Sequence, residues 1–149
     1  MMIHFFLHKI IASMPTEEEQ TLVFVKPDGV KRGLVGKIIN QFEEKGLKLQ
    51  KLEMRTMTSE LADKHYEEHV NKSFYPSLKE FIMSGPVVAL VLQGLNAVKA
   101  VRSVVGKTDS SIADPGSIRG KYSLSKSENI VHASDSTESA KREISNFFN

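Results

Sequence analysis

The chain has 149 residues, of which 40% are hydrophobic and 26% are charged, and its formal net charge is +2. This composition is typical of one globular domain and excludes a disordered tail. Because the chain has no cysteine, disulfides and thiolate metal sites are excluded. No apolar run is long enough to span a membrane, and we expect a cytoplasmic protein. We expect residues 1–15 to be an N-terminal extension and residues 16–149 to form the domain.

The first part of the domain predicts a strand, a helix and a second strand. Residues 21–26 are a β-branched and aromatic run that ends at a Pro-Asp-Gly turn signal, as a strand does. Apolar residues then recur at helical spacing over 34–42, and Gly46 supplies the stop. Apolar residues alternate with polar ones at Leu47 and Leu49, as in a strand, but the next apolar residues, Leu52 and Met54, fall on the opposite phase of this alternation. The shift predicts a strand with a bulge near residues 50–51.

The middle of the chain predicts three helices and one buried strand. A helix is expected over residues 58–70, followed by a shorter helix that starts at Pro76. Residues 87–92 are apolar on both faces, as in a central strand, and the next helix runs from Asn96 toward a glycine at 106. Residues 106–123 lack periodicity, and so long a loop in a compact domain is usually functional.

The last part of the chain predicts a short strand and a closing helix. In a strand over 129–132, Ile130 and His132 would lie on the same face because side chains alternate. Asp135 would then cap the closing helix. The complete order of elements predicts an α/β (α+β) fold of the ferredoxin-like, split βαβ type: an antiparallel four-stranded sheet covered by helices, with one long loop that binds the ligand.

The positive charges of the domain are concentrated in turns rather than spread over one long surface. Such local clusters favour a small anionic ligand over a long polyanion. The cations in or beside turns rich in Gly, Pro and Ser are Lys26, Lys31, Arg32, Arg102, Lys107, Arg119 and Lys121.

The triplet Gly106-Lys107-Thr108 is similar to the end of a P-loop, but it does not meet the requirements of that motif. The earlier glycine would fall on Val101, and the triplet follows a predicted helix instead of a strand. A glycine-containing loop after a helix still exposes backbone donors, so Lys107 and Thr108 could contact phosphate without a P-loop.

The segment from His65 to His69 matches H-x-x-E-H, the inverted zinc-peptidase signature. On a continuous helix both imidazoles would share one face, as a zinc site requires. No third ligand is evident in the sequence. A zinc hydrolase is therefore kept as an alternative hypothesis, and the preferred function is inferred from other residues.

His132 follows an apolar couplet and precedes the predicted start of a helix. Backbone N–H groups and the helix dipole favour negative charge there, so this imidazole could bind a phosphate or accept one. Arg102 and Arg119 could hold phosphate oxygens in a bidentate manner. Phe74, next to Tyr75 and a proline, could stack on a flat ring.

Four segments occur in an order that resembles the nucleoside diphosphate kinase family, and the resemblance extends from about residue 20 to the C-terminus. The segments are TLVFVKPDGVKRGLVGKII at 21–39, SGPVVALVL at 84–92, IADPGSIRGKYS at 112–123 and NIVHASDS at 129–136. The resemblance implies transfer of the terminal phosphate of a nucleoside triphosphate, typically ATP, to a nucleoside diphosphate. It further implies a ping-pong mechanism through a phosphohistidine, with Mg²⁺ carried by the nucleotide phosphates and no metal bound by the protein itself.

The same resemblance implies roles for nine side chains. His132 would accept the phosphoryl group, with Glu143 orienting its other ring nitrogen and Tyr66 in support. The nucleotide would be bound by Lys26, Phe74, Arg102, Thr108, Arg119 and Asn129, with Phe74 on the base, Asn129 on the 3′-hydroxyl and the two arginines with Thr108 on the β- and γ-phosphates.

Two positions depart from the family pattern. Ala133 replaces a glycine, which requires that this residue keep φ below zero. Lys126 stands where the family often has an apolar residue over the base. The family also implies a homo-oligomer, for which a hexamer is favoured and a tetramer is the alternative.

A ferredoxin-like nucleic-acid-binding module is the alternative function, motivated by the predicted fold and the basic loops. That hypothesis expects aromatic side chains on the central strands, as in RNA-binding sheets. Residues 87–92 carry none, and residues 21–26 carry only Phe24. Nucleic acid is therefore expected to be a secondary partner at most, and no membrane partner is expected.

Overall fold

The computed structural model describes residues 18–149, so the predicted extension, residues 1–15, lies outside the described residues. The elements are, in chain order, β1 (Glu18–Val25), α2 (Pro27–Lys31), α3 (Val35–Glu44), β2 (Lys48–Thr56), α4 (Ser59–His65), α5 (Tyr75–Ile82), β3 (Pro86–Leu95), α6 (Ala97–Val105), the 3-10 turn η1 (Ser110–Ile112), α7 (Ile118–Tyr122), β4 (Val131–Ala133) and α8 (Thr137–Phe148). None of these helices is long and apolar enough to span a membrane.

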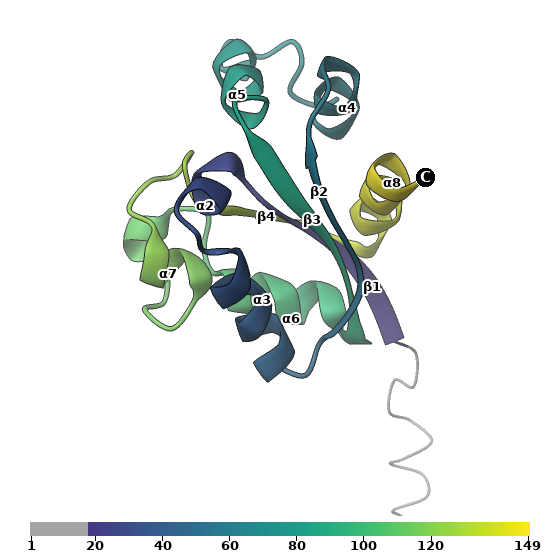
Figure 1. Ribbon diagram of the computed structural model, residues 1–149, viewed down its shortest axis with the longest axis vertical. Coiled ribbons are helices and arrows are strands. Elements are labelled where there is room, and N and C mark those ends of the chain that lie inside the picture. Colours follow the sequence, from purple (N-terminus) through teal and green to yellow (C-terminus); the bar gives the residue numbers. More distant parts are fainter. Residues whose placement is uncertain (1–17) are drawn as a thin grey trace, which may run out of the picture.

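The four strands form one sheet in the order β2-β3-β1-β4, and every neighbouring pair is antiparallel (Figure 1). This order is that of a split βαβ sheet, so the predicted ferredoxin-like fold is confirmed. The predicted bulge is also present, because the register of β2 against β3 shifts between Leu49 and Lys51.

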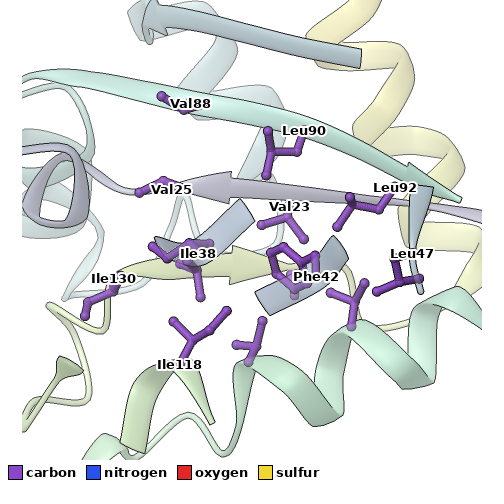
Figure 2. Packing of buried hydrophobic residues seen from close by; sticks show 14 of the residues in the cluster. Val23, Val25, Ile38, Phe42, Leu47, Val88, Leu90, Leu92, Ile118 and Ile130 are labelled. Carbon is purple, nitrogen blue, oxygen red and sulfur yellow. The ribbon is translucent and has the colours of Figure 1, made fainter. Parts of the chain in front are cut away.

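The sheet separates two hydrophobic clusters, and β1 contributes to both. Val23 and Val25 point to the face covered by α3, α6 and α7, where they meet Ile38, Phe42 and Ile118 (Figure 2). Leu22 and Phe24 of β1 point to the opposite face, which α4, α5 and α8 cover (Figure 1). Residues 21–25 of β1 and 87–92 of β3 are therefore buried on both faces, which explains the almost continuous apolar sequences of these two segments.

Two glycines permit the chain to leave its helices on this apolar side. Gly46 follows α3 with φ 99°, and Gly106 follows α6 with φ 89°. Residues with a Cβ rarely adopt these values, so glycine ends each helix at the residue that the sequence predicts.

Three boundaries differ from the sequence predictions. α4 begins after Thr58, whose hydroxyl accepts a hydrogen bond from the Leu61 amide, but it ends at His65 and does not continue to residue 70. The predicted long loop contains η1 and α7, which are too short to produce a periodic pattern. The N-cap of α8 is Ser136 instead of Asp135, and its hydroxyl accepts the hydrogen bond of the Ser139 amide.

The expected face for Ile130 is also wrong. β4 starts one residue later, and Ile130 adopts φ 77° in the left-handed region. This conformation breaks the alternation of the strand, so the Ile130 side chain joins the cluster of Val23 and Val25 while His132 packs against Phe24 on the other face.

Candidate active site

One cleft of about 690 Å³ brings together the nine side chains to which the family resemblance gives a role, whereas Lys107 does not line it. Its lining comes from segments that are far apart in the chain, at the end of β1, between α4 and α5, along α6 and α7, and around β4 and α8. The nine predicted residues that line it are Lys26, Tyr66, Phe74, Arg102, Thr108, Arg119, Asn129, His132 and Glu143. Their individual roles stay predictions, but their grouping is a property of the fold.

His132 is held between a carboxylate and an aromatic ring. Its Nε2 atom forms a hydrogen bond with Oε1 of Glu143 on α8, and Glu143 is only 3% exposed. The imidazole stacks on Phe24 of β1, with ring centroids 4.7 Å apart and an interplanar angle of 21°. Among the described residues none forms a hydrogen bond with Nδ1, and the side chain is 22% exposed, so Nδ1 is the ring nitrogen that a ligand can reach.

The surroundings of His132 keep its imidazole neutral. Burial is the largest cause that lowers the pKa of His132 to about 3, and the positive charges of Lys26, Arg119 and Arg102 contribute to this shift against the opposing effect of Asp135. Burial acts in the opposite direction on the carboxyl group of Glu143 and raises its pKa. At neutral pH the ring therefore carries one proton, which the hydrogen bond to Glu143 assigns to Nε2. A neutral imidazole with an unprotonated Nδ1 is a nucleophile.

Lys26 extends into the cleft from the end of β1. Its Nζ atom donates to Oδ1 of Asn129 over 2.7 Å, and Asn129 in turn donates to the backbone carbonyls of Thr108 (3.2 Å) and Lys126 (2.8 Å). Burial, assisted by Arg119, lowers the pKa of Lys26 to about 8. Among the described residues no carboxylate forms an ion pair with this ammonium group, so it is available to an anionic ligand.

Arg102 and Arg119 reach the same region from α6 and α7. Arg119 is 4% exposed and donates to the carbonyls of Gly106 (3.0 Å) and Val131 (2.8 Å). Arg102 donates to the carbonyl of Ala133 over 3.2 Å and forms an ion pair of 3.1 Å with Asp135. The two guanidinium groups thus fix the backbone on both sides of His132 while placing positive charge beside it.

The segment that precedes His132 is strained. A β-branched residue with positive φ, such as Ile130, costs roughly 1–3 kcal/mol and persists only where neighbours enforce it. Here its carbonyl accepts from the Lys26 amide over 2.7 Å, and its amide donates to Oδ2 of Asp28 over 3.1 Å. The strain therefore couples the ends of β1 and β4, which carry Lys26 and His132.

Aromatic side chains occupy another part of the cleft. Tyr66 lies at the end of α4, and burial raises the pKa of its hydroxyl group. Phe74 is 51% exposed, although large apolar side chains are mostly buried. Its ring has His69 at 5.6 Å between centroids and the Nζ atom of Lys72 at 5.8 Å. An exposed ring with this setting can stack on a planar ligand.

Sequence reasoning missed the position of His65 in this site. The residue is 6% exposed, and its ring lies 4.5 Å from that of His132 between centroids, in an edge-on arrangement. A signal was present, because His65 falls four residues after Leu61 and three after Ala62, on the buried stripe of α4. The match to the zinc-peptidase signature instead directed attention to a pairing of His65 with His69, whereas the histidine ring that His65 contacts is that of His132.

Two earlier hypotheses fail on this geometry. Because α4 ends at His65, His65 and His69 do not share a helical face, and the zinc-peptidase arrangement does not form. Phe24 is fully buried beneath α4 and α8, so neither β1 nor β3 offers an exposed aromatic side chain to a nucleobase. The requirement on Ala133 is met, because among the described non-glycine residues only Asn96 and Ile130 have positive φ.

Comparisons with known proteins show which family the chain resembles. Residues 19–149 match the sequence profile of the family described as nucleoside diphosphate kinase. The chain is 56% identical over 126 residues to a nucleoside diphosphate kinase of Staphylothermus marinus, covering 85% of this chain and 89% of the relative. It is 53% identical over 130 residues to one of Saccharolobus solfataricus, covering 87% and 94%. Among solved structures, the halophilic nucleoside diphosphate kinase of Halobacterium salinarum in complex with CDP is similar with a TM-score of 0.86 and 44% identity, over 89% of each chain.

Proposed function

The chain belongs to the nucleoside diphosphate kinase family, and on that premise we propose that it moves the terminal phosphate of a nucleoside triphosphate to a nucleoside diphosphate through a phosphohistidine at His132. The observation that carries the proposal is the hydrogen bond between His132 Nε2 and Glu143, which leaves Nδ1 unprotonated and facing the cleft. The enzyme is thus a phosphotransferase.

The chemistry follows from the tautomer. The lone pair of His132 Nδ1 attacks the terminal phosphorus, the bond from phosphorus to the bridging oxygen breaks, and the nucleoside diphosphate leaves. The ring then carries a positive charge, which the carboxylate of Glu143 stabilises through the Nε2 proton. In the second half, the terminal oxygen of another nucleoside diphosphate attacks phosphorus and the P–N bond breaks. No general base is required, because Nδ1 has no proton to lose.

The three cations of the cleft stabilise the charge on the transferring group. Lys26, Arg102 and Arg119 all lie close enough to His132 to lower its pKa, so they also lie close to any phosphate that reaches Nδ1. Asn129 and Thr108 would bind the ribose and phosphates, Phe74 would stack on the base, and Tyr66 would support the reacting end. Stacking tolerates every base, which suits an enzyme with several substrates.

A divalent metal is part of the chemistry of this family, and we propose Mg²⁺ bound through the nucleotide. When bound, the ion neutralises phosphate charge. The residues of the cleft fit this arrangement, because the phosphate region presents cations instead of the several oxygen ligands of a protein cage. The protein residues bind the phosphates, and the phosphates bind the ion.

The experiment that tests the function is intact-protein mass spectrometry after incubation with ATP and Mg²⁺, followed by addition of GDP. An acid-labile gain of roughly 80 Da, removed by GDP, is expected for the unaltered protein and must be absent in His132→Ala. His69→Ala is the matched control, since His69 lines the same cleft and should leave the adduct in place. A folded His132→Ala variant that still forms the adduct would contradict the proposal.

We also propose a homo-oligomer, with a hexamer favoured over a tetramer. β2 forms an edge of the sheet and exposes Leu52 (55%) and Met54 (60%), and an uncovered apolar edge strand is a ready contact surface. Native mass spectrometry would measure the subunit number, and a monomer at micromolar concentration would refute this part. The cytoplasmic location stays a prediction.

A further inference from the structure

Three ligating side chains meet beneath the cleft, and one of them is not used by the phosphoryl transfer. One ring nitrogen of His65, one ring nitrogen of His132 and a carboxylate oxygen of Glu143 all lie within 4.8 Å of one another, and the atoms nearest to Oε1 of Glu143 are Nδ1 of His65 and Nε2 of His132. Two histidines and one glutamate are the protein ligands of a common class of zinc site, in which a fourth position stays open. This set differs from the zinc-peptidase signature, because it pairs His65 with β4 and α8 instead of with His69.

His65 contributes a polar atom that has no partner. Its side chain is 2% exposed, and among the described residues nothing forms a hydrogen bond with Nδ1. The nearest acceptor, Oε1 of Glu143, lies 3.8 Å away, which is too far for a hydrogen bond. An unsatisfied buried polar group costs about 1–3 kcal/mol, so its persistence at a site of this composition points to a ligand.

The ring of His65 is held in this direction by its neighbours. It contacts Phe24 edge-on at 5.1 Å, Tyr66 at 4.5 Å and His132 at 4.5 Å between centroids. Zinc bonds to nitrogen and oxygen of about 2.0–2.1 Å place neighbouring ligand atoms of a tetrahedron about 3.3 Å apart. Small side-chain rotations therefore bring the three atoms to the required spacing. The open fourth position would face the cleft, which all three residues line.

We propose that His65, His132 and Glu143 bind a divalent cation of the zinc class, and that the bound ion holds His132 in a tautomer that cannot accept a phosphoryl group. Binding the ion uses the lone pair of His132 Nε2. The ring stays neutral, so its single proton moves from Nε2 to Nδ1, and Nδ1 loses the lone pair that attacks phosphorus. The ion-bound form is therefore inactive until the ion leaves.

The reverse exclusion follows by linkage. A phosphorylated Nδ1 requires the proton at Nε2, where it donates to Glu143, so the phosphoenzyme has no free nitrogen for the ion at that position. The groups expected to bind the nucleotide, such as Lys26 and Asn129, are not among the three residues that would bind the ion. The ion should accordingly slow phosphorylation of the enzyme without weakening nucleotide binding.

The binding part is tested by titrating the full-length protein with Co²⁺ alone and recording its visible absorption. One saturable equivalent with the intense bands of a tetrahedral ion, displaced by Zn²⁺, is expected for the unaltered protein and for His69→Gln. His65→Gln should bind at least about 100-fold more weakly, because loss of a direct ligand exceeds the 10–100-fold cost of losing an outer partner. Absence of saturable tetrahedral binding to the unaltered protein would overturn the proposal, as would a loss in His69→Gln with His65→Gln unaffected.

The regulatory part rests on the proposed function and has a separate readout. Phosphohistidine formation is timed at buffered free Zn²⁺, and the ratio of rates without and with zinc is compared between the unaltered protein and His65→Gln. The ratio should rise with Zn²⁺ occupancy only in the unaltered protein, with the Kd for the nucleotide unchanged. Equal ratios in both proteins would refute inhibition through this site. If no phosphohistidine forms even without zinc, the proposed function fails, and the Co²⁺ titration still decides whether the site exists.

Discussion

The two faces of the sheet use the same strand for different purposes. On the side of α3, α6 and α7, β1 presents Val23 and Val25 to a cluster that is entirely apolar. On the side of α4, α5 and α8, it presents Leu22 and Phe24, and Phe24 packs directly on His132 as well as on apolar neighbours. The first face thus contributes mainly to stability. The second face contains buried ionisable groups in place of some apolar contacts, and the pKa values of these groups depend on their burial.

Phe42→Ala should have the largest effect on the apolar face. The ring is fully buried, so its removal should lower the free energy of unfolding by about 3–5 kcal/mol. The rate of transfer per folded molecule should not change, because Phe42 lies on the opposite side of the sheet from His132. Urea denaturation and steady-state kinetics on the same sample measure the two quantities. A lower kcat in a fully folded variant would show that the two faces of the sheet do not act independently.

Glu143→Gln should have the opposite effects, with a large loss of activity and no loss of stability. The amide oxygen can still accept a hydrogen bond from the Nε2–H group but cannot stabilise the positive charge of the phosphohistidine, so kcat should fall about 100-fold. Because burial raises the pKa of Glu143, a neutral side chain should leave the free energy of unfolding unchanged or higher. Single-turnover kinetics and thermal unfolding provide the comparison. A variant that is active but unstable would assign Glu143 to the structure alone.

The pH dependence of kcat/KM should report Lys26. Burial lowers the pKa of this ammonium group to about 8, so its charge is present below pH 8 and is lost as the pH rises above it. We expect kcat/KM to fall about tenfold per pH unit well above this value, and the fall should disappear in Lys26→Arg because a guanidinium stays charged. An unaltered alkaline limb in Lys26→Arg would assign it to another group.

Ala133→Gly should have the smallest effect. Ala133 lies in β4 with negative φ, so glycine brings no conformational benefit there and adds chain entropy to the unfolded state. The free energy of unfolding should fall by roughly 0.5–1 kcal/mol, with little change in kcat, as measured by urea denaturation and steady-state assays. A gain in stability would show that the alanine side chain is strained against its buried surroundings.

Local patterns in the sequence predict the elements that have strong periodicity or unambiguous stops. The apolar runs of β1 and β3, the helical spacing before Gly46, and the phase change near Lys51 all predict what the structure contains. Nine site residues could be named because the chain resembles a known family, and four of them, Lys26, Arg119, Asn129 and His132, fall in the segments that carry this resemblance. Boundaries were missed where the signal is short, as at the end of α4 and in the loop that contains α7.

Which of these residues meet, and in which chemical state, depends on how the chain folds. No local pattern places His65 against His132, because their rings meet through the packing of α4 and β4 against Phe24 and not through their spacing in the chain. The lowered pKa of His132 and the assignment of its Nε2 proton likewise depend on burial and on a carboxylate from α8. Desolvation and hydrogen bonding are properties of a folded environment, so a sequence can name the imidazole but cannot state whether its reactive nitrogen is free.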